Sequence, residues 1–265
     1  MWQMKIKLFC DKCECPACSE PNKIMVVNPH GKQYSIEITD KLLYEFHCEK
    51  GHLNRFFITN PKYELLFDMG LCAYFNGFYR EAVLDFAASL ERFYESCTNI
   101  FLIARYPDQN VCSEKIEQLW KPISRQSERQ YGAFLTSYMM IKGHLPELFP
   151  EKQTQFRNKV THQGFFPNEN DTLMYAKAVA KFIINIIEEL TDGFKADKLT
   201  SFRFSETVQN NNQINKEMRE KGLPSNEKIN GHTIFSFFRN HYSKDDWFDC
   251  MLKEFRDSYG DRYDA

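Results

Sequence analysis

The chain has 265 residues, of which 43% are apolar and 15% aromatic, and its formal net charge is −2. This composition is sufficient for one large core or two smaller domains. The small net charge excludes a strongly basic nucleic-acid-binding protein, so any site for a polyanion must be a local patch. No segment approaches the length of a membrane-spanning run, and the first residues lack the apolar core of a signal peptide. We therefore expect a soluble, cytoplasmic protein with no membrane partner.

The first sixty residues are predicted to form a small β-rich domain. Short segments rich in Ile, Val, Phe and Tyr are separated there by Pro, Gly or Asp, which is the pattern of strands joined by turns. The predicted strands are residues 4–9, 24–28, 34–38, 43–47 and 53–59.

The cysteines are concentrated in this N-terminal domain. It contains Cys10, Cys13, Cys15, Cys18 and Cys48, and the other four cysteines are scattered singly along the chain. An odd and uneven set in a chain expected to be cytoplasmic argues against a disulfide scaffold and for a metal site. Zinc prefers four sulfur or nitrogen ligands in a tetrahedron, often supplied by two short turns.

The stretches CPACSEPN and FHCEKGHL resemble the two knuckles of a zinc ribbon. They predict a zinc site made by Cys15, Cys18, Cys48 and His52. Cys10 and Cys13 form an alternative first knuckle, because they too follow a predicted strand. With four protein ligands the zinc would be structural, one ion per chain, and its binding could supply about 10 kcal/mol to a thin β core.

From Pro61 onward the apolar residues recur at helical intervals of three and four. One such stripe is Val83, Phe86, Ala87, Leu90, Phe93, Tyr94 and Cys97, and another is Ala176, Val179, Ala180, Ile183, Ile187 and Leu190. Residues 113–121 and 125–142 are also predicted to be helical. The stretch NGFYREAVLDFAASLERFYE resembles one tetratricopeptide helix pair, but no second copy follows at a fixed period, which favours a single helix of a bundle.

The fold class predicted from these patterns is α+β. A β-rich zinc ribbon spans residues 1–60, an all-α bundle spans residues 61–192, and residues 193–265 form a C-terminal extension. The extension begins with a polar stretch and contains helix-like aromatic pieces at residues 233–240 and 244–258.

The stretch QFRNKVTHQGF, residues 155–165, stands apart from the apolar stripes. On one helix, Arg157 and His162 would lie about 140° apart in rotation and about 7.5 Å apart along the axis, so they would not share a face. Gly164 and Pro167 predict that the helix ends close after His162. A guanidinium can hold two phosphate oxygens at once, and an imidazole can move a proton near neutral pH. The pair is suited to phosphodiester chemistry without a catalytic metal.

The arrangement Arg157-Asn158-x3-His162-x-Gly164, with a long amphipathic helix before and after it, resembles the HEPN superfamily. The resemblance covers about residues 62–192, half of the chain. It implies an all-α bundle that forms a homodimer, with the two motifs meeting at the interface. It also implies a metal-independent endoribonuclease that uses the ribose 2′-hydroxyl as nucleophile.

On this resemblance, His162 would activate or protonate the reacting oxygens, Arg157 would stabilise the phosphate, and Asn158 would orient or contact it. Such proteins often act in toxin–antitoxin or anti-phage defence systems, which suggests RNA as substrate and an antitoxin or another protein as partner. The alternative is a non-catalytic adaptor whose ribbon and bundle bind a protein or nucleic acid. A similar triplet further along the chain, Arg239-Asn240-His241, has the wrong spacing and is interpreted as surface helix.

Overall fold

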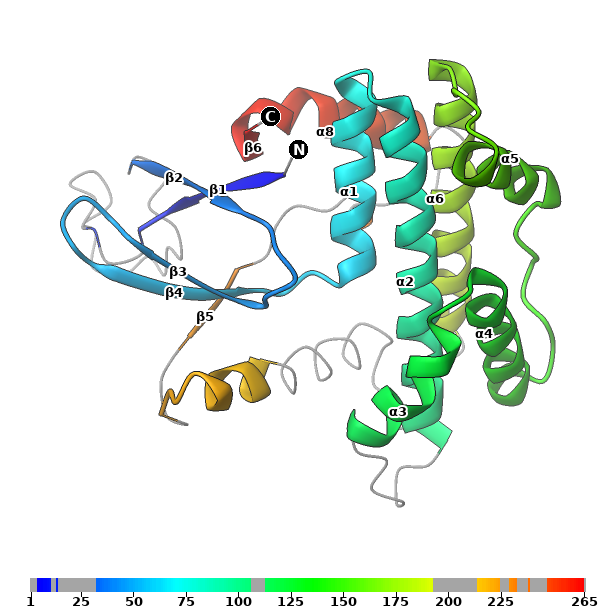
Figure 1. Cartoon of the computed structure of the whole chain (residues 1–265), viewed down its shortest axis with the longest axis horizontal. Coiled ribbons are helices and arrows are strands. Elements are labelled where there is room, and N and C mark those ends of the chain that lie inside the picture. The colour runs from blue at the N-terminus through cyan, green and yellow to red at the C-terminus, as the bar shows by residue number, and fades with distance from the viewer. Residues whose placement is uncertain are drawn as a thin grey trace. The chain divides into compact units, whose positions relative to one another are not determined.

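The computed structural model describes residues 4–10, 13, 32–105, 113–192, 214–224, 229–232, 238 and 247–264 (Figure 1). The fold class is α+β, as predicted, with strands in the N-terminal part and mostly helices after them. The chain divides into two compact units. Unit 1 comprises Met1–Thr59, Gln213–Ile234 and Lys253–Ala265, and unit 2 comprises Asn60–Asn212 and Phe235–Leu252.

Unit 1 contains two three-stranded sheets. The first has the order β2 (Gln33–Glu37), β1 (Lys5–Phe9) and β6 (Tyr263–Asp264), with antiparallel pairing throughout. In the second, β3 (Leu43–His47) pairs antiparallel with β4 (Leu53–Ile58), which pairs in parallel with β5 (Asn230–His232). Four predicted strands are thus confirmed, and the predicted strand 24–28 lies outside the described residues. The third strand of each sheet comes from the C-terminal part of the chain.

A helical segment from the C-terminal part packs against the second sheet of unit 1. Residues 214–220 are helical, and Ile214 and Met218 pack against Leu43 of β3. From the same segment, Glu217 accepts hydrogen bonds from the backbone N–H groups of Leu42 at 2.9 Å and Leu43 at 3.0 Å. The segment therefore covers an apolar side chain of β3 and also satisfies two backbone donors at its start.

Unit 2 is a helical bundle. Its helices are α1 (Lys62–Phe75), α2 (Tyr79–Arg105), α3 (Ser113–Ile123), α4 (Ser127–Lys142), α5 (Glu151–His162) and α6 (Glu169–Asp192). A further helix, α8 (Trp247–Arg262), agrees with the predicted helical piece 244–258, and its residues up to Leu252 belong to unit 2. Of the predicted piece 233–240, only Phe238 is described, and it is buried.

Helix α2 occupies the centre of unit 2, where it contacts α1, α4, α5 and α6 (Figure 1). All seven residues of the predicted apolar stripe on α2 are buried, as are all six of the stripe on α6. A bundle helix that is covered on several sides buries a wide apolar stripe, which the spacing in the sequence indicates. The predicted helical bundle is therefore confirmed at its two longest members.

A glycine of α1 lies in close contact with α2. A Cβ atom added to Gly70 would lie 2.6 Å from two ring atoms of Phe86. The Phe86 ring is fully buried and packs against Phe67 with ring centroids 4.8 Å apart, so it has no free space into which to move. The close approach of α1 to α2 therefore requires a residue without a side chain at position 70.

We expect Gly70→Ala to destabilise the protein by about 1–3 kcal/mol, the usual cost of overpacking a close-packed core. Gly132→Ala is the matched control, because Gly132 is an exposed glycine of α4 with no atom within 4 Å of a built Cβ. That change should be neutral or should stabilise by up to about 1 kcal/mol, since alanine is the better helix former. Urea denaturation followed by circular dichroism measures both, and equal effects would contradict the packing argument.

Candidate functional site

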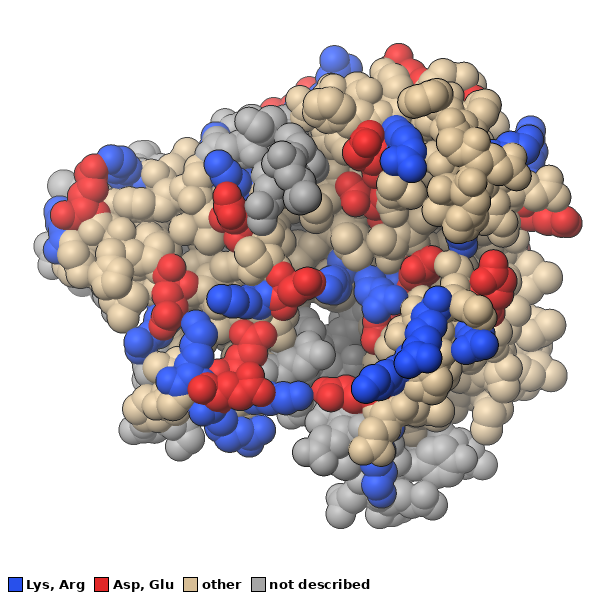
Figure 2. Space-filling view, viewed as in Figure 1, with Lys and Arg blue, Asp and Glu red and all other residues tan. Residues whose placement is uncertain are grey.

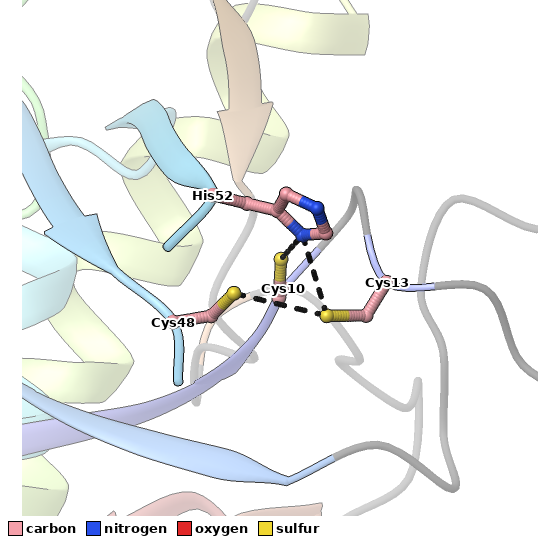
Figure 3. A group of neighbouring side chains, drawn as sticks. All are labelled: Cys10, Cys13, Cys48 and His52. Atoms are coloured by element: carbon pink, nitrogen blue, oxygen red, sulfur yellow. Dashed lines mark hydrogen bonds between the residues drawn. The ribbon is translucent and has the colours of Figure 1, made fainter. Parts of the chain in front are cut away.

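Four potential metal ligands come together in unit 1. Cys10 directly follows β1 and Cys13 lies three residues further on, whereas Cys48 follows β3 and His52 precedes β4. Cys10 and Cys48 are buried, and Cys13 and His52 are half-buried. The ligand atoms of all four residues lie within 4.8 Å of one another, and Figure 3 shows the side chains directed toward a common centre.

The spacing of these atoms fits a tetrahedral metal site. The Sγ atoms of Cys13 and Cys48 are 3.8 Å apart, and His52 Nδ1 lies 3.6 Å from Cys13 Sγ and 3.8 Å from Cys10 Sγ. Zinc–sulfur and zinc–nitrogen bonds of ordinary length give tetrahedral edges of about 3.8 Å between two sulfurs and about 3.6 Å between sulfur and nitrogen. A disulfide is excluded for Cys13 and Cys48, because its sulfurs would be about 2 Å apart. The four residues can therefore hold a metal ion such as zinc.

The loop between β3 and β4 positions two of the ligands. Gly51 has a φ of 77°, and its N–H donates to the carbonyl of Cys48 at 2.8 Å, while the N–H of Cys48 donates to the carbonyl of His52 at 3.1 Å. Burial by itself would raise the pKa of Cys48, but hydrogen bonds from the backbone of His52 and Lys50 hold the pKa below its ordinary value. Such bonds stabilise a thiolate, which is the form that binds a metal.

The Cys13 thiol behaves differently. Burial, together with hydrogen bonds to the thiols of Cys10 and Cys48, raises its pKa to about 11. Three thiolates this close would repel one another without a cation between them. Metal binding at this cluster should therefore release protons.

The structure brings together the alternative first knuckle. Cys48 and His52 are in the cluster as predicted, and the other two positions are taken by Cys10 and Cys13. The first-choice residues Cys15 and Cys18 lie outside the described residues. Sequence alone did not separate the two pairs, because both follow the same strand and have the same spacing.

The residues of the Arg–His motif lie on α5. Arg157 and Asn158 are half-buried, and His162 is the exposed last residue of the helix. Gly164 has a φ of 68°, and the N–H of Phe165 donates to the carbonyl of Lys159 at 3.2 Å, so the chain turns away after His162. The predicted helix end close after His162 is confirmed. The similar triplet Arg239-Asn240-His241 lies outside the described residues.

Arg157 lines an open cleft formed where α2, α4, α5 and α6 meet. Other residues of this cleft are Glu91, Tyr94, Ser127, Glu128, Tyr131, Thr154 and Tyr175. The guanidinium of Arg157 lies close enough to Tyr175, which is almost completely buried, to act on the ionisation of its hydroxyl. Burial raises the pKa of Tyr175 well above its ordinary value, and the guanidinium opposes that shift. The tyrosine thus stays a neutral partner of the cation at physiological pH.

The guanidinium of Arg157 has no salt bridge with any carboxylate in the part of the chain that the structure describes. Partial burial removes water from this cation without supplying a carboxylate as counter-charge. His162 is not among the residues that line this cleft. Within one chain, therefore, the structure places Arg157 in this cleft without His162.

Several cleft residues were not predicted from the sequence. Glu91 is next in sequence to Leu90 of the α2 stripe and Tyr175 immediately precedes the stripe of α6, so neither stands out from a helix that packs in the core. Ser127, at the start of α4, donates a hydrogen bond to Glu91. Only the packing of four helices places these residues next to Arg157.

The surface carries no broad field of one sign on the face drawn in Figure 2. There, Lys and Arg side chains are interspersed with Asp and Glu among the residues shown in colour.

In the described part of the chain, none of the helices has the length and apolar character required to cross a membrane. Comparisons with protein-family models, curated proteins and solved structures find no match to this chain.

The geometry of the cluster predicts which cysteines bind the metal. Cys10→Ser, Cys13→Ser and Cys48→Ser should each lose the one ion per chain that the wild-type protein is expected to hold, because each removes one corner of the tetrahedron. Cys15→Ser and Cys18→Ser are matched controls and should keep it. Metal content of the purified proteins, measured by mass spectrometry, decides between the pairs. Loss of metal in the two controls alone would assign the first knuckle to Cys15 and Cys18.

Proposed function

We propose that this protein is a metal-independent endoribonuclease of the HEPN type, acting in the cytoplasm in a toxin or anti-phage defence role. The proposal rests on the surroundings of the Arg157 side chain. Its guanidinium is half-buried in an open cleft, without a salt bridge among the described residues, five positions before an exposed histidine. An anionic phosphate would supply the missing counter-charge.

In the proposed reaction, the ribose 2′-hydroxyl oxygen attacks the adjacent phosphorus and the bond from phosphorus to the 5′ oxygen breaks. The products are a 2′,3′-cyclic phosphate and a 5′-hydroxyl. His162 takes the proton from the 2′-hydroxyl or delivers one to the leaving oxygen, which its exposed position on α5 permits. Arg157 binds the phosphate oxygens, and Asn158, next to it on the helix, orients the phosphate.

The separation of Arg157 from His162 supports a homodimer in which two copies share the site. His162 does not line the cleft of its own chain, and three large apolar side chains that follow it in the sequence are exposed. Phe166 is 85% exposed, Met174 47% and Phe165 42%. Exposed apolar side chains of this size beside a functional motif are suited to an interface between subunits.

The cluster in unit 1 is proposed to hold one zinc ion with a structural role. Cys10, Cys13, Cys48 and His52 would fill all four positions of a tetrahedral ion, which leaves none for substrate. No catalytic metal is part of the proposal. The zinc-bearing unit would help to recruit RNA or a protein partner such as an antitoxin.

The second candidate function is a non-catalytic adaptor that binds a protein or nucleic acid. It is favoured by the same separation, because an exposed His162 that does not meet Arg157 within one chain is also compatible with a site that has no catalytic role. In the adaptor the motif would only help dimerisation, so RNA cleavage and its dependence on His162 distinguish the two candidates.

His162→Ala should lower the rate of RNA cleavage at least about a hundredfold, since positioned acid–base catalysis contributes about 10²–10⁴ in rate. Arg157→Lys should also be impaired, because lysine lacks the planar fork. His144→Ala is the control, an exposed histidine of the same unit that does not line the cleft, and it should cleave like wild type. Gel assays with total RNA measure the rates, and circular dichroism checks folding.

The products should carry 2′,3′-cyclic phosphate ends, and RNA with 2′-O-methyl groups at the cut positions should resist cleavage. Activity should persist during short exposure to a chelator. Undiminished cleavage of the methylated RNA, or by His162→Ala, would exclude the proposed mechanism and favour the adaptor.

The dimer can be tested separately from the chemistry. Sedimentation should give a dimer at micromolar concentration, and Phe166→Glu should shift it toward monomer, because a charge at an apolar interface costs free energy. Mixed dimers of one wild-type and one His162→Ala subunit should keep less than half of the wild-type activity. A fully active monomer would show that one chain completes the site alone.

A further inference from the structure

The cleft that contains Arg157 carries more negative than positive charge. Its charged lining residues in the described chain are Glu91 on α2, Glu128 on α4 and Arg157 on α5. A bare phosphate there would be attracted by one guanidinium and repelled by two carboxylates. The electrostatics therefore favour a ligand that presents an anion to Arg157 and hydrogen-bond donors to a carboxylate.

Glu91 is the carboxylate whose position is fixed. It is half-buried, and the hydroxyl of Ser127 donates to one of its oxygens across the cleft. It acts electrostatically on the hydroxyls of both Tyr94 and Tyr175, which are also affected by Arg157, so all four groups lie near one another. A carboxylate accepts about four hydrogen bonds, so the one from Ser127 leaves capacity for a ligand. Glu128, by contrast, is exposed.

Tyr131 supplies an aromatic wall beside these charges. It is half-buried, and its ring lies 5.1 Å from the ring of Tyr94. Its hydroxyl accepts a hydrogen bond from the backbone N–H of Phe149 at 3.2 Å, which fixes the orientation of the side chain. Bases of single-stranded RNA stack on aromatic side chains held in this way.

We propose that this cleft binds the nucleotide whose phosphate Arg157 contacts, and that Glu91 selects guanine as its base. Guanine is the RNA base that presents two adjacent donors, N1–H and the N2 amino group, on one edge, and a carboxylate accepts both. Uracil, cytosine and adenine each place an acceptor next to their donor, which a carboxylate repels. The inference rests on the proposed function, because it names the substrate base of the same site.

The test uses ribonucleoside 3′-monophosphates, which are bound but cannot be cleaved, and measures their affinities by NMR titration. Wild type should prefer guanosine over uridine 3′-monophosphate by about tenfold, the discrimination that one bidentate contact to a base provides. Inosine 3′-monophosphate lacks only the N2 amino group and should lose most of the preference. Arg157→Lys should weaken binding of every nucleotide by a similar factor.

Glu91→Gln should abolish the preference for guanosine without weakening the binding of uridine 3′-monophosphate. Glu128→Gln is the matched control, the same change in an adjoining residue of the same cleft, and should alter the preference less than about twofold. Ser127→Ala provides a second variant that frees Glu91 without removing it, and should reduce the preference partially. Circular dichroism confirms that each variant is folded.

Equal affinities of wild type for guanosine and uridine 3′-monophosphates, or an unchanged preference in Glu91→Gln, would overturn the inference. RNA cleavage is measured separately with the wild-type protein. Cleavage with no guanine at the cut sites would overturn guanine selection while leaving the ribonuclease in place. A preference for guanosine 3′-monophosphate in a protein that leaves RNA intact would support the nucleotide cleft and overturn the proposed cleavage.

Discussion

The burial of α2 is the constraint on which unit 2 depends. This 27-residue helix contacts α1, α4, α5 and α6, so its side chains have to pack against four neighbouring helices at once. On the side of α1, close packing is possible because position 70 is a glycine, against which the Phe86 ring packs. On the side of α4, α5 and α6, packing is incomplete, and a cleft with polar side chains remains. The candidate site is therefore the part of the α2 surface that the bundle does not cover.

The electrostatics of that cleft distinguish it from an ordinary core defect. Buried polar groups are normally paired, because removal from water has to be compensated by hydrogen bonds or counter-charges. Here the guanidinium of Arg157 lies near the neutral Tyr175 hydroxyl, and Glu91 accepts a hydrogen bond from the neutral hydroxyl of Ser127. Opposite charges thus share one cleft without neutralising each other directly. This arrangement keeps both groups available to a ligand that carries an acceptor and donors together.

Unit 1 meets a different difficulty, since short strands bury few large side chains. Its described buried residues include Ile6, Leu8, Leu43 and Ile58, which form a modest core for two small sheets. The Cys–His cluster lies at the ends of β1, β3 and β4, where a bound ion would join the two sheets through its coordination bonds. Zinc coordination of this kind adds free energy that a small apolar core lacks. The β3–β4 loop, with Gly51 in the left-handed region, is shaped to present two of the ligands.

Local patterns in the sequence were sufficient for the elements themselves. The alternation in β1 and β4, the stripes of α2 and α6, and the end of α5 before Gly164 all follow from interactions between residues close together in the chain. Cys48 and His52 belong to this category, because one hairpin loop carries both. The sequence also drew attention to Arg157 and His162, because they lie outside the apolar stripes and packing of a helix core does not account for them.

The tertiary structure alone decided what lies beside these residues. The choice of Cys10 and Cys13 in the cluster depends on how β1 ends relative to the β3–β4 loop, which no spacing along the chain records. The third strands β5 and β6 come from more than 170 residues away in the chain, so no local pattern links them to their partners. Likewise, Glu91, Ser127 and Tyr175 are separated in sequence from Arg157 by 66, 30 and 18 residues and reach it only because four helices pack around one another. Periodicity reports which face of a helix is buried, but the identity of the neighbour is fixed by the packing of the whole bundle.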